Sequence, residues 1–152
     1  HFSGLVEQYV GNIIDEGLFL GPALAQKNQE FLKQNQIGHI LFVGIGLETR
    51  YPDLYQYKQY DLKDLTSEEL SIHFEEMFDF IDEGRSKGSV YVHCAAGMSR
   101  SATVVIAYLM KKNNWSLEES LEYVKSKRSV IEPNPGFLEQ LGKYEKVLFG
   151  ND

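Results

Sequence analysis

The sequence of 152 residues contains a single cysteine, Cys94. One cysteine cannot form an intramolecular disulfide and leaves no second thiol to resolve an oxidised sulfur, which excludes a dithiol redox enzyme. One cysteine and four scattered histidines also do not give the ligand spacing of a zinc centre. A lone free thiol is typical of a reducing compartment, so we expect the chain to act in the cytoplasm or the nucleus.

Long apolar runs and excess positive charge are also missing. No apolar run approaches the length needed to span a bilayer, so no membrane insertion is expected. Lys and Arg total 15 against 22 Asp and Glu, which gives a net charge of −7. The cations do not cluster, and Lys125 to Arg128 is only a short run expected on a helix. This charge disfavours a nucleic-acid or anionic-membrane partner, because both need a basic patch.

The chain length suits one domain over residues 1–152, and 43% hydrophobic residues are enough to fill its core. Helical and apolar strand patterns alternate, which predicts a three-layer α-β-α domain of the α/β class. A hairpin is expected around Asp15-Glu16-Gly17. The expected strands cover 39–44, 55–60 and 89–93; the expected helices cover 22–35, 67–87 (capped by Ser67) and 101–113, with two more starting after Ser116 and at Pro135.

The segment from His93 to Ser101 carries the chemistry. An apolar strand leads into Cys94, Gly97 lies within the following turn, and an apolar helix starts at Arg100. Such a loop points successive backbone N–H groups inward at a helix N-terminus, which favours an anion. There the cysteine is expected as a nucleophilic thiolate, and the arginine can hold an oxyanion with two parallel hydrogen bonds. The alternative is a buried core thiol and a surface cation, which leaves the loop ending in Arg-Ser unexplained.

This segment resembles the His-Cys-five residues-Arg-Ser/Thr signature of the cysteine-based protein phosphatases. More narrowly, residues 78–82, 96–103, 106–110, 129–137 and 140–141 resemble the dual-specificity phosphatases, and the resemblance covers about Gly17 to Phe149. Because the sequence shows no separate kinase-docking domain, the chain resembles the small, atypical members of that family. The resemblance implies a central mixed, mostly parallel sheet and a phosphocysteine mechanism without metal or cofactor. Residues implied to bind the phosphate are Ala95, Ala96, Gly97, Met98, Ser99 and Arg100, with Cys94 as the nucleophile.

A proton donor for the leaving oxygen is also needed. In the resembling family this is an Asp about ten residues before a helical aromatic and thirty before the nucleophile. Asp64, ten residues before Phe74, fits that spacing, and Asp61 is the alternative. Solvation of the loop or a helix cap is the plain interpretation of both residues.

Three further side chains are assigned supporting roles around the loop. Ser101 is expected to donate a hydrogen bond to Cys94 or to cap the helix. His93 is expected to be buried and neutral, bonded to backbone near the loop. The resemblance implies that Asn134 braces the loop, although Asn between two prolines also suits a simple turn.

Phosphorylated proteins are the expected partners, because the loop side chains Ala95, Ala96 and Met98 carry no cation for a polyanionic ligand. A short chain suits a shallow site that accepts phosphotyrosine and phosphoserine/threonine esters. Removal of phosphate from proteins is expected to serve signalling. Two alternatives stay open: a phosphosite-binding pseudophosphatase or scaffold, and a phosphatase of a non-protein substrate such as an inositol lipid or a glucan. The oligomeric state is left open.

Overall fold

A five-stranded sheet organises the fold, as shown by a computed structural model that describes residues 8–150. The strands are β1 (Asn12–Asp15), β2 (Leu18–Pro22), β3 (Ile37–Val43), β4 (Gln56–Tyr60) and β5 (Ser89–Cys94), and their order is β1-β2-β5-β3-β4. β1 and β2 pair antiparallel, whereas β2–β5, β5–β3 and β3–β4 pair in parallel. The expected hairpin and the mixed, mostly parallel sheet are therefore confirmed.

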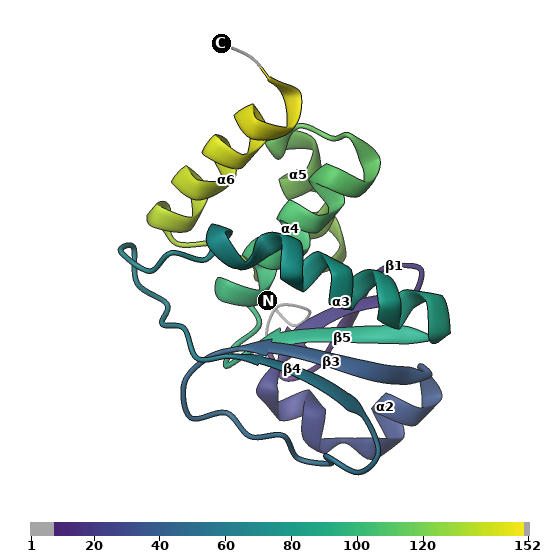
Figure 1. Cartoon of the computed structure of the whole chain (residues 1–152). Helices are drawn as coiled ribbons and strands as arrows, with labels where there is room; N and C mark the ends of the chain where they lie inside the picture. Colours follow the sequence, from purple (N-terminus) through teal and green to yellow (C-terminus); the bar gives the residue numbers. More distant parts are fainter. Residues whose placement is uncertain (1–7, 151–152) are drawn as a thin grey trace.

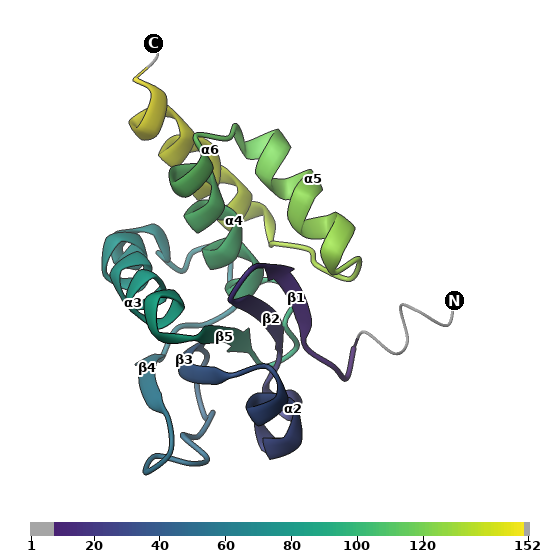
Figure 2. The ribbon, with the colours of Figure 1, turned by 90° about the vertical axis from the view of Figure 1, so that its right-hand side faces the viewer.

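Helices cover both faces of this sheet (Figure 1). The short 3₁₀ helix η1 (Ala23–Lys27) and α2 (Gln29–Gln34) lie on one side. The other side carries α3 (Phe74–Lys87), α4 (Arg100–Asn113), α5 (Leu117–Lys127) and α6 (Pro135–Phe149). Figure 2 shows α4, α5 and α6 side by side, with α4 packed on the sheet. The predicted three-layer α-β-α architecture is confirmed.

Period-two alternation divides the strand residues between two cores. In β5, Val90 and Val92 face the α3–α6 side, whereas Tyr91 between them packs on the α2 side. β3 alternates in the same way, with Leu41 and Val43 on the first face and Phe42 on the second. Every residue of α4 from 101 to 110 is buried, because this helix lies between the sheet and the two last helices. The apolar run after Arg100 is thus explained by complete burial of that helix.

Two predicted helices are shorter than the sequence suggested. The helix expected over 22–35 is broken at Asn28, whose side chain accepts from Phe31 N (3.2 Å) and so caps a separate α2. The helix expected over 67–87 begins only at Phe74, after a 3₁₀ turn, η2 (Ser71–His73). Ser67 is therefore not its cap. Gln140 of α6 explains the late start, since its Oε1 accepts from the backbone N–H of Leu70 and Ser71.

The carboxyl ends of the four parallel strands meet at one edge of the sheet, where ligands bind in open α/β folds. β5 ends there at Cys94, and β4 ends at Tyr60, just before the segment that carries Asp61 and Asp64. Within residues 8–150, no helix combines the length and apolar character needed to cross a bilayer.

Candidate active site

Cys94 lies at the end of β5, where the chain leaves the sheet and turns into α4. The residue is buried, and its sulfur has two polar neighbours. Ser101 Oγ lies 3.0 Å from Cys94 Sγ, and the backbone N–H of Gly97 donates to Sγ over 3.3 Å. A core thiol would have apolar surroundings, whereas this sulfur faces donors that stabilise an anion.

The loop between Cys94 and α4 is held so that its carbonyl groups point outward. Five successive carbonyls each accept a hydrogen bond from the surrounding structure. Cys94 O accepts from His93 Nδ1 (3.1 Å), Ala95 O from Ala23 N (3.0 Å) and Ala96 O from Arg128 Nη2 (3.2 Å). Gly97 O accepts from Arg128 Nε (2.9 Å), and Met98 O accepts from Glu132 N (2.6 Å). Because a peptide's N–H points opposite to its carbonyl, the loop amides face the interior of the loop, which forms an anion-binding concavity.

Gly97 allows this compact loop. Its φ of +70° lies in the left-handed region, and a Cβ built there would lie 2.3 Å from the carbonyl carbon of Gly21 at the end of β2. A side chain is therefore excluded both by backbone conformation and by contact with β2.

Arg100 is the first residue of α4, and its guanidinium lies at the mouth of the loop. Nη1 donates to Leu62 O of the segment after β4 (3.1 Å). Nε is buried and has no hydrogen-bond partner within residues 8–150. A buried guanidinium N–H without a partner is costly, so this donor fits an oxyanion held between Arg100 and the loop amides.

Of the two candidate acids, only Asp64 is brought to the loop. Its Oδ1 accepts from Ser99 Oγ (2.8 Å) and from Asn134 Nδ2 (2.9 Å). Asp61 instead accepts from the side chain of Gln59, two residues earlier in β4 (3.0 Å). The close packing of Gly136 on Thr66 holds the segment in place, since a Cβ on Gly136 would lie 2.1 Å from Thr66 O. This arrangement supports Asp64 over Asp61.

Asn134 combines both interpretations made from the sequence. Its side-chain oxygen accepts from Phe137 N (2.9 Å) and so caps α6, as a turn residue would. Its backbone N–H donates to Ser99 Oγ (3.0 Å), and its side-chain amide donates to Asp64. Asn134 therefore joins the start of α6 to the catalytic loop and to the candidate acid.

Ser101 faces the sulfur and does not cap α4. The N-cap of that helix is Ser99, two residues earlier, which makes no side-chain capping bond because its hydroxyl donates to Asp64. The capping role considered for Ser101 is thus wrong, and the contact with Cys94 remains.

His93 is fully buried at the end of β5, with its ring between Phe42 (centroids 5.1 Å apart) and Tyr91 (5.3 Å). Burial lowers the pKa of His93 to about 4, so the ring is neutral near pH 7. Its Nδ1 lies 3.1 Å from Cys94 O. The expectation of a buried, neutral histidine bonded to nearby backbone is confirmed.

Sequence reasoning missed two residues that shape the loop. Arg128 is not simply part of a helical cationic run: it is the C-cap residue that follows α5, is fully buried and donates to Ala96 O and Gly97 O. Gln26 of η1 is also buried and lies 2.7 Å from His93 Nε2. No sequence signal marks either residue, because both reach the loop from elements distant along the chain.

Comparisons with known proteins agree with this geometry. Residues 18–147 match the family described as "Dual specificity phosphatase, catalytic domain". The chain is 43% identical over 139 residues to dual specificity protein phosphatase 1B of Arabidopsis thaliana, covering 91% of this chain and 83% of the relative.

Solved structures give the same result. Human DUSP28 superposes with a TM-score of 0.87 at 33% identity, covering 91% of this chain and 95% of that one. The human tyrosine phosphatase-like serine/threonine/tyrosine-interacting protein superposes with a TM-score of 0.89 at 32% identity, covering 93% and 99%. This chain therefore belongs to the dual-specificity protein phosphatases, hydrolases of the cysteine-based phosphatase superfamily, and is similar to their small atypical members.

Proposed function

We propose that this chain hydrolyses phosphotyrosine and phosphoserine/threonine esters of proteins in two steps, with Cys94 as nucleophile, Arg100 as phosphate ligand and Asp64 as general acid. The observation that carries the proposal is that inward-facing amides, a sulfur and a guanidinium are combined in one loop. Five outward carbonyls turn the amides inward, and the Cys94 sulfur and the Arg100 guanidinium belong to the same loop. Such preorganised donors stabilise the charge of a transferring phosphoryl group.

In the first step, Cys94 Sγ attacks phosphorus and the bond from phosphorus to the ester oxygen breaks. Asp64 donates its proton to that oxygen, which leaves as an alcohol or phenol. Within residues 8–150, both hydrogen bonds to the Asp64 carboxyl are accepted by Oδ1. Oδ2 is thus the oxygen assigned to carry the transferred proton.

In the second step, the Asp64 carboxylate takes a proton from a water molecule, whose oxygen attacks the phosphocysteine. The sulfur–phosphorus bond breaks and inorganic phosphate is released. Ser101 Oγ, 3.0 Å from Sγ, donates to the departing sulfur and favours its release as an anion.

The loop side chains support a protein substrate. Ala95, Ala96 and Met98 project no charge from the loop, so the phosphate is held by amides and Arg100 alone. This neutral surface suits a single phosphate on a side chain better than a polyanionic headgroup. With one free cysteine that must stay reduced, we place this activity in the cytoplasm or nucleus.

The test is hydrolysis of p-nitrophenyl phosphate by the reduced protein in the presence of chelator. We expect turnover by the parent, none by Cys94→Ser, and a loss of about two to four powers of ten in kcat for Asp64→Asn. Asp61→Asn is the matched control and should stay near the parent rate. Equal losses in the two Asp variants would contradict the assignment of Asp64.

Substrate class is tested with a second panel. Phosphotyrosine and phosphothreonine peptides are compared with an inositol phosphate and a phosphorylated glucan at equal concentration. Higher kcat/KM for the peptides supports the proposal, and preference for either non-protein substrate contradicts it. A folded, reduced parent without turnover that still binds phosphopeptide would instead identify a phosphosite-binding module.

A further inference from the structure

We propose that Gln26 is a positioning residue that fixes the tautomer of His93 and so orients the first peptide of the catalytic loop. Gln26 lies in η1, more than sixty residues from the loop in sequence, and is almost fully buried. The inference rests on the proposed role of Cys94, whose carbonyl belongs to that first peptide.

The orientation of the Gln26 amide is determined by its neighbours. One side-chain atom receives two donors, the backbone N–H of Arg50 (2.9 Å) and the hydroxyl of Tyr57 (2.8 Å). A backbone N–H can only donate, so this atom must be the oxygen, Oε1. The amide nitrogen Nε2 then faces His93.

The amide in turn determines the protons of His93. Gln26 Nε2 and His93 Nε2 lie 2.7 Å apart, and an amide nitrogen can only donate. His93 Nε2 must therefore be the unprotonated acceptor, which places the ring proton on Nδ1. From there it is donated to Cys94 O, 3.1 Å away. The Nδ1–H tautomer satisfies both bonds. The Nε2–H tautomer would place two N–H donors against each other at Nε2 and leave Cys94 O without its donor.

The surroundings support the neutral form. Burial lowers the pKa of His93, and its ring is held between Phe42 and Tyr91. Burial also raises the pKa of Tyr57, so its hydroxyl keeps the proton that it donates to Gln26. The polar chain formed by Tyr57, Gln26, His93 and the Cys94 carbonyl is thus satisfied at every step.

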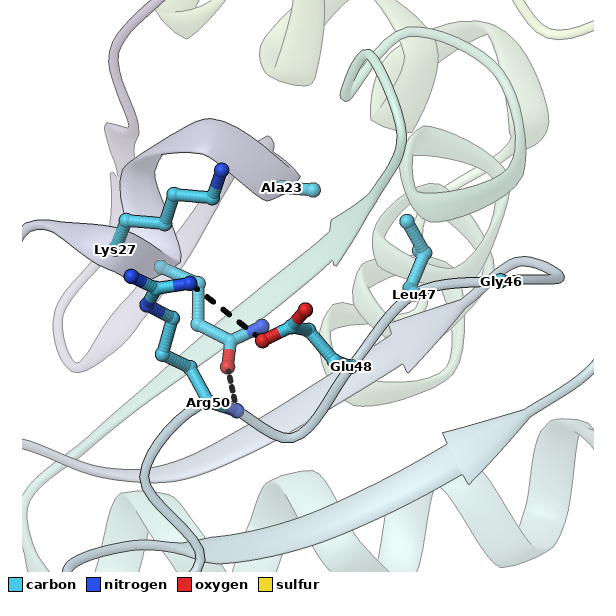
Figure 3. A pocket seen from close by; sticks show the side chains of 7 residues that line it. Ala23, Lys27, Gly46, Leu47, Glu48 and Arg50 are labelled. Carbon is cyan, nitrogen blue, oxygen red and sulfur yellow. Dashed lines mark hydrogen bonds and ion pairs between the residues drawn. The ribbon is translucent and has the colours of Figure 1, made fainter.

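This polar chain also reaches the segment between β3 and β4. Arg50 N donates to Gln26, and Tyr51 N donates to the Tyr57 hydroxyl (3.1 Å). Gln26 lies in the wall of a cavity of about 200 Å³ bounded by η1 and by this segment, with Lys27, Glu48 and Arg50 around it (Figure 3). A shift of the segment would remove Arg50 N from Gln26 Oε1 and Tyr51 N from the Tyr57 hydroxyl, so the Gln26 amide would lose one of its two orienting donors.

Two substitutions of Gln26, to Met and to Glu, distinguish a positioning role from simple packing. Gln26→Met keeps the volume but removes the donor to His93. We expect kcat for an aryl phosphate to fall about tenfold to a hundredfold with KM within about twofold, because the phosphate is still held by Arg100 and the amides while the nucleophile is misoriented. Gln34→Met, an exposed position on α2, is the matched control and should leave both constants unchanged.

Gln26→Glu keeps the shape but places an acceptor opposite His93 Nε2. The ring can bond to that carboxylate and still donate to Cys94 O only when both nitrogens are protonated, so the pKa of His93 should rise above neutrality in this variant. Nitrogen-15 NMR of labelled histidine measures the protonation state of His93 and does not depend on catalytic turnover. The parent should show the Nδ1–H tautomer at pH 7, and Gln26→Glu should show the doubly protonated ring.

The outcomes are decisive in both directions. An Nε2–H tautomer in the parent would overturn the inference, as would a ring that keeps the neutral Nδ1–H tautomer in folded Gln26→Glu at pH 7. If Gln26→Met folds with the kinetics of Gln34→Met, Gln26 has no positioning role. Because the NMR signature does not depend on catalysis, failure of the proposed phosphatase mechanism would be recognised separately.

Discussion

The buried Arg128 provides a quantitative test of how the loop is held. Among residues 8–150 its guanidinium donates to four acceptors: Gly97 O (2.9 Å), Ala96 O (3.2 Å), Val10 O (2.8 Å) and Asn12 Oδ1 (2.7 Å). It thereby joins the end of α5 to the catalytic loop and to the start of β1. We predict that Arg128→Met destabilises the protein and disorders the loop, because these acceptors lose their donor in a buried site.

The magnitude follows from these bonds. A hydrogen bond from a charged donor contributes about 1.5–3 kcal/mol, and part of this is offset because Met avoids the cost of burying a charge. The expected loss in the free energy of unfolding is about 3–5 kcal/mol, a large fraction of the roughly 5–15 kcal/mol of a typical domain. kcat/KM should fall as well, since the amides that face the phosphate depend on the tethered carbonyls.

Urea unfolding followed by fluorescence measures this loss. Lys127→Met is the matched control. Lys127 is the exposed last residue of α5, directly before Arg128, and its replacement should change stability by less than about 0.5 kcal/mol. Equal urea midpoints for the two variants would refute the reasoning that Arg128 holds the loop.

Three further predictions concern the same site. Gly97→Ala should lose nearly all kcat/KM for p-nitrophenyl phosphate, because its Cβ would collide with Gly21; parent-like activity would show that the loop can relax. The pKa of His93 is lowered from 6.5 to about 4, so protonation favours the unfolded state. The free energy of unfolding should therefore be intact above pH 6.5 and about 2 kcal/mol lower at pH 5. Urea unfolding of the parent and of His93→Asn at both pH values should differ by this pH-dependent loss, and the same pH dependence in both proteins would contradict it. Ser101→Ala should slow release of the Cys94 sulfur, giving a burst of p-nitrophenol followed by a slower steady state; a reduced burst rate with unchanged turnover would place Ser101 in the first step.

Local signals explain why most elements could be predicted from the sequence. The β1–β2 hairpin follows from Asp15-Glu16-Gly17, and Gly17 indeed has a positive φ of 75°. The capping box at Ser116 and Pro135 at the start of α6 locate the last two helices. Each of these features depends on residues within one turn of chain.

The helix predicted over 67–87 was misjudged for a physical reason. The residues before Phe74 have the composition of a helix start, but the backbone N–H groups of Leu70 and Ser71 bond to Gln140 from α6. A tertiary acceptor replaced the cap that Ser67 was expected to supply. Propensity and spacing carry no information on such a distant partner.

The sequence by itself determined the chemistry of the loop: a thiol at the end of a strand, a glycine in the turn and an arginine at a helix start fall within seven residues, Cys94 to Arg100, and need only local geometry. Only the tertiary structure decided how that loop is held. Arg128, Asn134 and Gln26 come from three other parts of the chain, and each reaches the site through packing of an element on the sheet or on α4. Local sequence specifies reactive groups, whereas their orientation depends on buried polar partners whose positions exist only after folding.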